Sequence, residues 1–156
     1  MIRLSQLEGR WTIERRITDR RDGRDATFSG TAVFRPDDAG LVYDETGQLE
    51  IAGGGVMTAE RRYLWRETAP GQIAVLFADG RPFHTLDESG RDTHDCAPDI
   101  YRVRYEFGAW PAWSAHWSVT GPRKDYDSFS RYSPCTGAER GAETQPNTAA
   151  KTESTP

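Results

Sequence analysis

The chain has 156 residues, including 5 Trp, 6 Tyr and 6 Phe, and carries a formal net charge of −4. This length fits one domain with a core of its own. The acidic balance argues against a nucleic-acid partner, the lack of a long apolar run argues against a membrane partner, and two cysteines are too few for a disulfide framework. Because the opening residues also lack the apolar segment of a secretory signal, we expect a cytoplasmic protein.

The predicted elements begin with a short helical turn at residues 2–7, and the segments that follow have a hydrophobic period of two. Turn signals rich in Gly, Pro and Asp separate these segments. Alternate residues share one face within each of five runs: 11–17, 28–34, 57–65, 101–107 and 113–119. This pattern is typical of half-buried antiparallel strands in a sandwich or a barrel.

Charged residues on the inward faces favour the barrel. Arg15 lies between Ile13 and Ile17, and Arg61 lies between Ala59 and Tyr63. Glu45 shares the face of the apolar residues 41, 43 and 49. A buried charge is costly unless it is paired or hydrated, and a small barrel can enclose a partly hydrated cavity. We therefore predict an all-β, antiparallel, up-and-down barrel.

The domain is predicted to cover residues 1–134. Residues 135–156 contain no Val, Ile, Leu, Met, Phe, Trp or Tyr. Such a segment buries too little apolar surface to offset its loss of conformational entropy, so we expect a disordered, low-complexity tail.

The segment Leu7-Glu8-Gly9-Arg10-Trp11 resembles the Gly-x-Trp opening of lipocalins and other calycins. The resemblance implies that Trp11 closes one end of a calycin-like barrel and packs against a basic side chain of the last strand. Arg131 is the matching candidate, followed by Arg123.

A second resemblance covers most of residues 6–134. Its motifs are Leu7-x-Gly9-x-Trp11, Tyr63-Leu64-Trp65, Phe77-x-Asp79-Gly80-Arg81-Pro82-Phe83-His84, His94-x-Cys96-x-Pro98-Asp99-x-Tyr101 and Trp117-x-Val119-x-Gly121-Pro122-x-Lys124-Asp125-Tyr126. In this order they are similar to a family classed only as a domain of unknown function. The resemblance implies a calycin-like barrel and supplies no reaction.

His84, His94 and Cys96 are candidate ligands of a transition metal, with Asp99 as a fourth. His94 and Cys96 share one face of a strand, which is compatible with joint ligation. Their spacing matches no standard zinc pattern. No cofactor is therefore predicted, and zinc and haem stay open as alternatives for these histidines.

The same polar residues can instead form the floor or rim of a cavity with aromatic walls, the usual composition of a small-molecule site. Lys124 stands out because it is the only lysine within residues 1–134. The alternative is that Asp99 makes a turn after Pro98 and that each Arg pairs with a neighbouring carboxylate. The predicted ligand-binding residues are Arg15, Arg61, Tyr63, His84, His94, Tyr101, Trp117 and Lys124.

The leading functional hypothesis is the binding of a small, partly apolar, anionic molecule inside the barrel. One alternative is a barrel enzyme in which His84 or His94 acts as acid or base with Asp99 as its partner. Another is a structural or partner-binding domain, which would present a large exposed apolar patch. A homodimer is compatible with a barrel of this size. Trp110, which precedes Pro111, is predicted at a hairpin tip where it could gate a barrel mouth.

Overall fold

The computed structural model describes residues 2–135, which form one short helix and ten antiparallel strands. The predicted tail lies outside the described residues, except for Cys135, which is buried. Within the described part of the chain, no helix is long and apolar enough to cross a bilayer. The elements are α1 (Leu4–Leu7), β1 (Gly9–Asp19), β2 (Arg24–Pro36), β3 (Leu41–Ile51), β4 (Val56–Ala69), β5 (Gln72–Phe77), β6 (Pro82–Leu86), β7 (Arg91–Cys96), β8 (Asp99–Glu106), β9 (Trp113–Thr120) and β10 (Asp125–Pro134).

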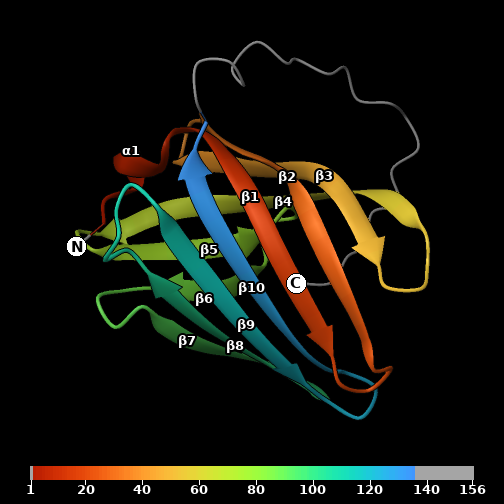
Figure 1. Ribbon diagram of the computed structural model, residues 1–156. Coiled ribbons are helices and arrows are strands. Elements are labelled where there is room, and N and C mark those ends of the chain that lie inside the picture. The colour runs from red at the N-terminus through yellow and green to blue at the C-terminus, as the bar shows by residue number, and fades with distance from the viewer. Residues whose placement is uncertain (1, 136–156) are drawn as a thin grey trace.

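The strands form a single sheet in the order β6-β5-β4-β3-β2-β1-β10-β9-β8-β7. Figure 1 shows the first and last strands, in red and blue, side by side. The edge strands β6 and β7 do not pair through their backbones; instead, the Thr85 backbone N–H donates to Asp92 Oδ2 at 2.6 Å. The predicted all-β, antiparallel, up-and-down barrel with a short N-terminal helical turn is confirmed. The barrel is not fully closed, because backbone pairing is interrupted between β6 and β7.

The helix end of the barrel, where α1 packs, is filled by apolar side chains. Leu4 and Leu7 are buried in the main core, and Trp11 Nε1 donates to the Leu7 carbonyl oxygen at 2.8 Å. The Trp11 ring contacts Trp110 and Trp113, with centroid distances of 5.5 and 5.8 Å. Trp110 lies in the turn between β8 and β9, at a hairpin tip as predicted, but this tip is at the helix end, which the core closes, so Trp110 does not gate a barrel mouth.

The expected contact between Trp11 and Arg131 is wrong. Ser130 and Tyr132 of β10 are buried, so Arg131 between them points to the outer face, where it is exposed. Side chains of a strand alternate between the two faces, and an outward residue cannot pack on an inward Trp11. The second candidate, Arg123, lies in the turn between β9 and β10, at the far end of the barrel from α1.

Strands β2 and β3 approach closely at two paired glycines, Gly30 and Gly47. A Cβ atom on Gly47 would lie 2.7 Å from Gly30 Cα and 2.7 Å from Phe28 Cζ. The guanidinium of Arg15 in turn lies over the Phe28 ring, 5.0 Å from its centroid. A larger residue at position 47 would therefore displace groups inside the barrel.

We expect Gly47→Ala to lower the free energy of unfolding by about 1–3 kcal/mol, because it forces extra volume into a packed site. Urea unfolding followed by tryptophan fluorescence measures this loss. Gly55→Ala is the matched control, since a Cβ atom there meets nothing within 4 Å. Equal stability of the two variants would contradict this prediction.

Large apolar side chains that are exposed occur at three separate places among the described residues. Val56 and Met57 begin β4 at the far end, Trp110 lies at the helix end, and Phe129 lies on the outer face of β10. They do not form the single large patch that the partner-binding alternative requires.

Candidate ligand-binding site

The barrel interior contains a cavity of about 440 Å³. Its wall includes exposed residues of the β1–β2 and β9–β10 turns, such as Asp22 and Arg123, so the cavity opens at the far end from α1. The volume falls within the range of small-molecule pockets. The aromatic part of the wall comprises Tyr43, Tyr63, Trp65, Phe83, Tyr105, Trp113, Trp117, Tyr126 and Tyr132.

Most of the predicted ligand-binding residues reach this wall. They are Arg15, Arg61, Tyr63, His84, Trp117 and Lys124. His94 and Tyr101 do not belong to it. Strand parity explains the agreement for Arg15, Arg61, Tyr63 and Trp117, which lie on the inward sides that the period-two pattern predicts. Lys124 lies in a turn at the mouth, and His84 is turned inward by a bulge in β6.

Arg15 is part of a closed polar network. Its Nη1 donates to Glu45 Oε2 at 2.6 Å, and its Nε donates to Ser130 Oγ at 2.6 Å. Tyr43 donates its hydroxyl to Glu45 Oε1 at 2.6 Å and lies 2.9 Å from the Tyr132 hydroxyl. Arg15 and Glu45 are 9% and 3% exposed.

The electrostatics of this pair follow from its geometry. Burial alone would raise the pKa of Glu45, but the charge and hydrogen bonds of Arg15 outweigh burial and lower that pKa to about 2. Burial alone would lower the pKa of the Arg15 guanidinium, but the negative charge and hydrogen bonds of Glu45 have the larger effect and raise it. The two charges neutralise each other, so this part of the wall presents no free charge to a ligand.

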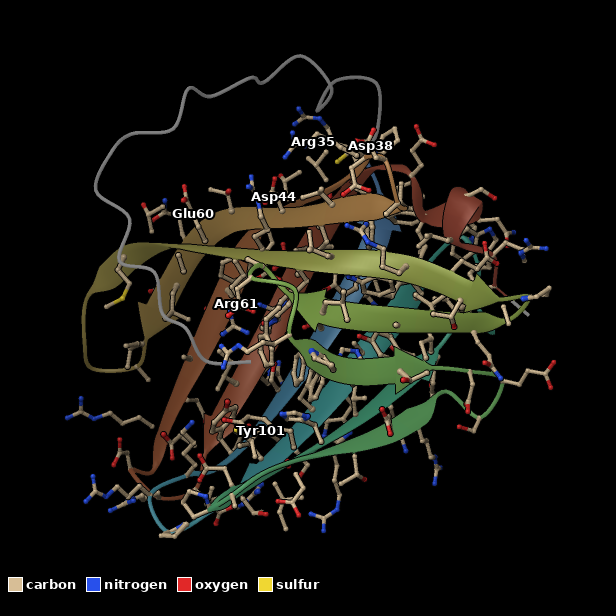
Figure 2. All side chains as sticks on the ribbon, turned by 180° about the vertical axis from the view of Figure 1, so that it is seen from behind. Arg35, Asp38, Asp44, Glu60, Arg61 and Tyr101 are labelled. Carbon is tan, nitrogen blue, oxygen red and sulfur yellow. The ribbon has the colours of Figure 1, made fainter. Side chains whose placement is uncertain are left out.

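Arg61 is placed differently. It is half-buried and lies opposite Glu45 in the register of β3 and β4. Figure 2 shows Arg61 inside the barrel, whereas Asp44 and Glu60 lie on the outer side of the same two strands. Within the described part of the chain Arg61 makes no ion pair; Glu45 pairs with Arg15 and acts on Arg61 only through its charge at longer range.

The groups around Arg61 keep it charged. Burial alone would lower the pKa of Arg61, but Tyr63 and Glu45 raise it above its ordinary value. Burial raises the pKa of Tyr126 to about 12 although Arg61 and Lys124 oppose that change. Burial also raises the pKa of Tyr63 above its ordinary value. Both tyrosines are therefore neutral at ordinary pH, and Arg61 presents a permanent positive charge to the cavity.

His84 is buried at the β5–β6 bulge. The register there shifts between Val75 and Leu76, so the consecutive residues Phe83 and His84 are both buried. His84 Nε2 lies 2.8 Å from the Tyr105 hydroxyl, and its Nδ1 has no partner in the described structure. Burial, and to a lesser degree His94, lowers the pKa of His84 to about 3, so the ring is neutral at ordinary pH.

Lys124, Tyr101 and Asp99 form a second polar group near the mouth. Lys124 Nζ donates to the Tyr101 hydroxyl at 2.8 Å and lies 3.3 Å from Asp99 Oδ2. The Asp99 carboxylate also lies close to Gly121 in the β9–β10 turn, where a Cβ atom would come within 2.0 Å of its Oδ1. Asp99 is thus the ion-pair partner of Lys124. The alternative that each Arg pairs with a neighbouring carboxylate holds for Arg15, which pairs with Glu45.

The structure does not bring the proposed acid–base residues together. The hydrogen-bond partner of His84 is Tyr105, and the ion-pair partner of Asp99 is Lys124. His94 is half-buried and packs edge-on against Phe83, with a centroid distance of 5.3 Å. The spacing in the sequence placed these residues on nearby strands but could not fix their partners.

The metal candidates are also not gathered. Cys96 is an exposed free thiol at the end of β7, and His84 is buried inside the barrel. Among residues 2–135, no three side chains of His, Cys, Asp or Glu are arranged to hold a metal ion.

Sequence reasoning missed several cavity residues that strand parity could have found. Tyr126, Ser128, Ser130 and Tyr132 alternate along β10, and all four line the cavity. Glu45 was recognised as an inward charge but not as the partner of Arg15, since the two residues lie on β1 and β3 with β2 between them.

The barrel has a counterpart among solved structures. The S-type phycobiliprotein lyase CPES from Guillardia theta matches with a TM-score of 0.57 and 10% sequence identity, over 85% of this chain and 90% of that chain. At this identity the similarity concerns the fold alone. No curated protein matches the chain significantly.

The sequence itself matches a family model over residues 7–134, almost the whole described part of the chain. The resemblance to a family known only as a domain of unknown function is thereby confirmed. The chain belongs to the family described as "Family of unknown function (DUF6314)".

Proposed function

We propose that this protein binds a small, partly apolar, anionic molecule inside its barrel. The observation that carries the proposal is the contrast between two cavity arginines. Arg15 is neutralised by Glu45, whereas Arg61 has no carboxylate of its own within the described part of the chain. A guanidinium held in a partly desolvated pocket favours a carboxylate or phosphate there.

The rest of the wall supports an apolar body for the ligand. Phe83 stacks on Trp117 with a centroid distance of 4.9 Å, and Tyr63 lies 5.8 Å from Phe83. Flat aromatic walls of this kind suit a flat or elongated apolar group. At the mouth, Arg24 and Arg123 line the cavity together with Asp19 and Asp22, and Lys124 pairs with Asp99, so the distinguishing positive charge is that of Arg61 inside the barrel.

The similar solved structure supports only the fold that this proposal assumes. It is described as a phycobiliprotein lyase, and at 10% identity it supports the barrel architecture without carrying that activity to this chain. A cytoplasmic location, a homodimer and the lack of a bound cofactor stay predictions.

Calorimetric titration with biphenyl-4-carboxylate tests the proposal. We expect binding to the full-length protein, and at least about tenfold weaker binding to Arg61→Gln, because the ligand anion loses its charge-assisted hydrogen bonds. Arg62→Gln is the matched control, since Arg62 neighbours Arg61 on β4 but points outward and pairs with Asp44.

The uncharged analogue biphenyl-4-carboxamide separates charge from shape. We expect it to bind more weakly than the carboxylate and to be almost indifferent to Arg61→Gln. Failure of the carboxylate to bind, or equal losses in Arg61→Gln and Arg62→Gln, would overturn the proposed role of Arg61.

A further inference from the structure

Strand β4 has an unpaired backbone edge along its first half. It pairs with β3 over residues 56–65 without a shift in register, whereas its pairing with β5 begins only at Tyr63. Within residues 2–135, no strand pairs with the other side of residues 56–62, and no backbone hydrogen bond from a turn reaches them. The terminal strands of the sheet, β6 and β7, face each other across the interrupted pairing, so their edges are shielded. The first half of β4 has no such neighbour.

The hairpin between β3 and β4 shows which backbone groups point to this open edge. The Ile51 N–H donates to the Gly55 carbonyl oxygen at 3.3 Å, so the odd-numbered residues of the two strands direct their backbone groups to each other. In a strand, the backbone groups of successive residues point to opposite sides. Val56, Thr58 and Glu60 therefore direct their N–H and C=O groups away from β3, to the open edge.

The side chains of the same segment are unusually exposed for apolar groups. Val56 and Met57 are 62% and 43% exposed. Residues 56–59 include no Lys, Pro or other charged residue, which are the usual means of protecting an open edge from pairing. Figure 2 shows Glu60 on the outer side of β4 and Arg61 inside the barrel. By alternation, the outer row is Val56, Thr58 and Glu60, and the inner row is Met57 and Ala59.

A second copy of this segment is complementary to the first. In an antiparallel pair centred on Thr58, that residue faces Thr58 of the second copy, and Val56 faces Glu60. On the inner side Met57 faces Ala59. Every hydrogen-bonding position then meets one whose N–H and C=O groups are also unpaired. No like charges oppose each other, and Thr–Thr and apolar pairs across strands are favourable.

Other registers are less favourable, and the chosen one has room. Shifting the pair toward the end of β4 places Glu60 opposite itself, or Met57 opposite the charged Arg61. With Thr58 at the centre, the hairpin of each copy passes beside Arg61 of the other. Residues 53–55 of that hairpin are all glycine, so they bring no side chain to this crossing.

We propose that two copies of this chain associate through the open edges of β4, by antiparallel pairing of residues 56–60 about a twofold axis at Thr58. The same surface is used on both copies, so the assembly closes as a dimer. Pairing covers Val56 and Met57 and satisfies the unpaired backbone groups. Two short strands form a small interface, so the dimer is reversible. The inference is independent of the proposed function.

Sedimentation of the full-length protein under reducing conditions tests the inference. We expect the mass to rise with concentration from 17.5 kDa toward twice this value. Val56→Glu opposes two carboxylates at both symmetry-related contacts with Glu60, and we expect it to raise the dimer dissociation constant about tenfold. Val56→Lys is the matched control, since it offers Glu60 an opposite charge at the same exposed position. We expect it to dimerise as tightly as the unaltered protein or more tightly.

A second pair of variants tests the role of the backbone. Thr58→Pro removes an N–H group that has no partner in one copy, and proline is tolerated at the open edge of a sheet. We expect this variant to fold and to stay monomeric where the unaltered protein is dimeric. Thr58→Val retains the N–H group, and we expect it to dimerise. Tryptophan fluorescence and far-UV circular dichroism report the fold of each variant.

The outcomes are decisive in either direction. A protein that stays at 17.5 kDa up to about 1 mM would overturn the inference and leave the edge to solvent or to another protein. A dimer that neither Val56→Glu nor Thr58→Pro weakens would place the interface elsewhere and overturn it as well. If Thr58→Pro does not fold, the contrast between Val56→Glu and Val56→Lys still decides.

Discussion

Replacing Glu45 by Ala is expected to lower the free energy of unfolding by about 3 kcal/mol or more, because it leaves the buried guanidinium of Arg15 without its counter-charge. Arg15 is 9% exposed and directs both Nη atoms to the two oxygens of Glu45, at 2.6 and 3.1 Å. The Tyr43 hydroxyl would also lose its acceptor. Chemical denaturation at pH 7 measures the loss.

The control for this variant is Glu50→Ala, a change of the same kind at an exposed position of β3. The double variant Arg15→Met with Glu45→Leu removes both charges, and we expect it to recover most of the lost stability, since replacing a buried pair with apolar groups is often close to neutral. Comparable stability of Glu45→Ala and Glu50→Ala would show that Arg15 is hydrated through the cavity and does not depend on Glu45.

Acidification is expected to destabilise the protein already below pH 6.5, through His84. The pKa of His84 is about 3 in the folded state and 6.5 as its ordinary value. As the pH falls below 6.5, the unfolded chain takes up a proton that the buried ring does not, so folding stability decreases until the pH reaches the folded pKa. The expected loss is about 2 kcal/mol by pH 5, since each pKa unit corresponds to about 1.4 kcal/mol.

The pH window distinguishes His84 from Glu45. Glu45, with a pKa lowered from 4.5 to about 2, also favours the folded state above pH 4.5 and loses that contribution only below this value. Between pH 6.5 and 4.5 we therefore expect His84→Phe to reduce the slope of unfolding free energy against pH, while His116→Phe, on the outer face of β9, retains it. A slope that is unchanged in His84→Phe would contradict a neutral, buried His84.

Much of the barrel could be predicted because a strand directs successive side chains to opposite faces. That rule placed Arg15, Arg61 and Tyr63 on the inside from their neighbours in the sequence alone. The same rule excludes Arg131 as a partner of Trp11, because its buried neighbours Ser130 and Tyr132 take the inward positions. The resemblance to calycins gave the correct fold and, at that position, the wrong contact.

The bulge in β6 could not be predicted from the alternation. Phe83 and His84 are consecutive and both buried, because the register with β5 shifts by one residue between Val75 and Leu76. A period of two assigns only one of them to the interior. Consequently, the pairing of His84 with Tyr105 did not follow from the motifs.

The sequence by itself determined the fold class, the inward charges and most of the cavity wall, because these depend on local alternation and on turns between adjacent strands. Only the tertiary structure decided which charge remains available to a ligand. Strand β2 lies between Arg15 on β1 and Glu45 on β3. The inward residues of β2 at this point are Gly30 and Ala32, which are small enough to let the two charged side chains meet above them. Pairing across a curved sheet depends on register and side-chain volume in three strands at once. This pairing neutralises Arg15 and leaves Arg61 as the cation that faces the cavity between the paired Arg15 and the residues of the mouth.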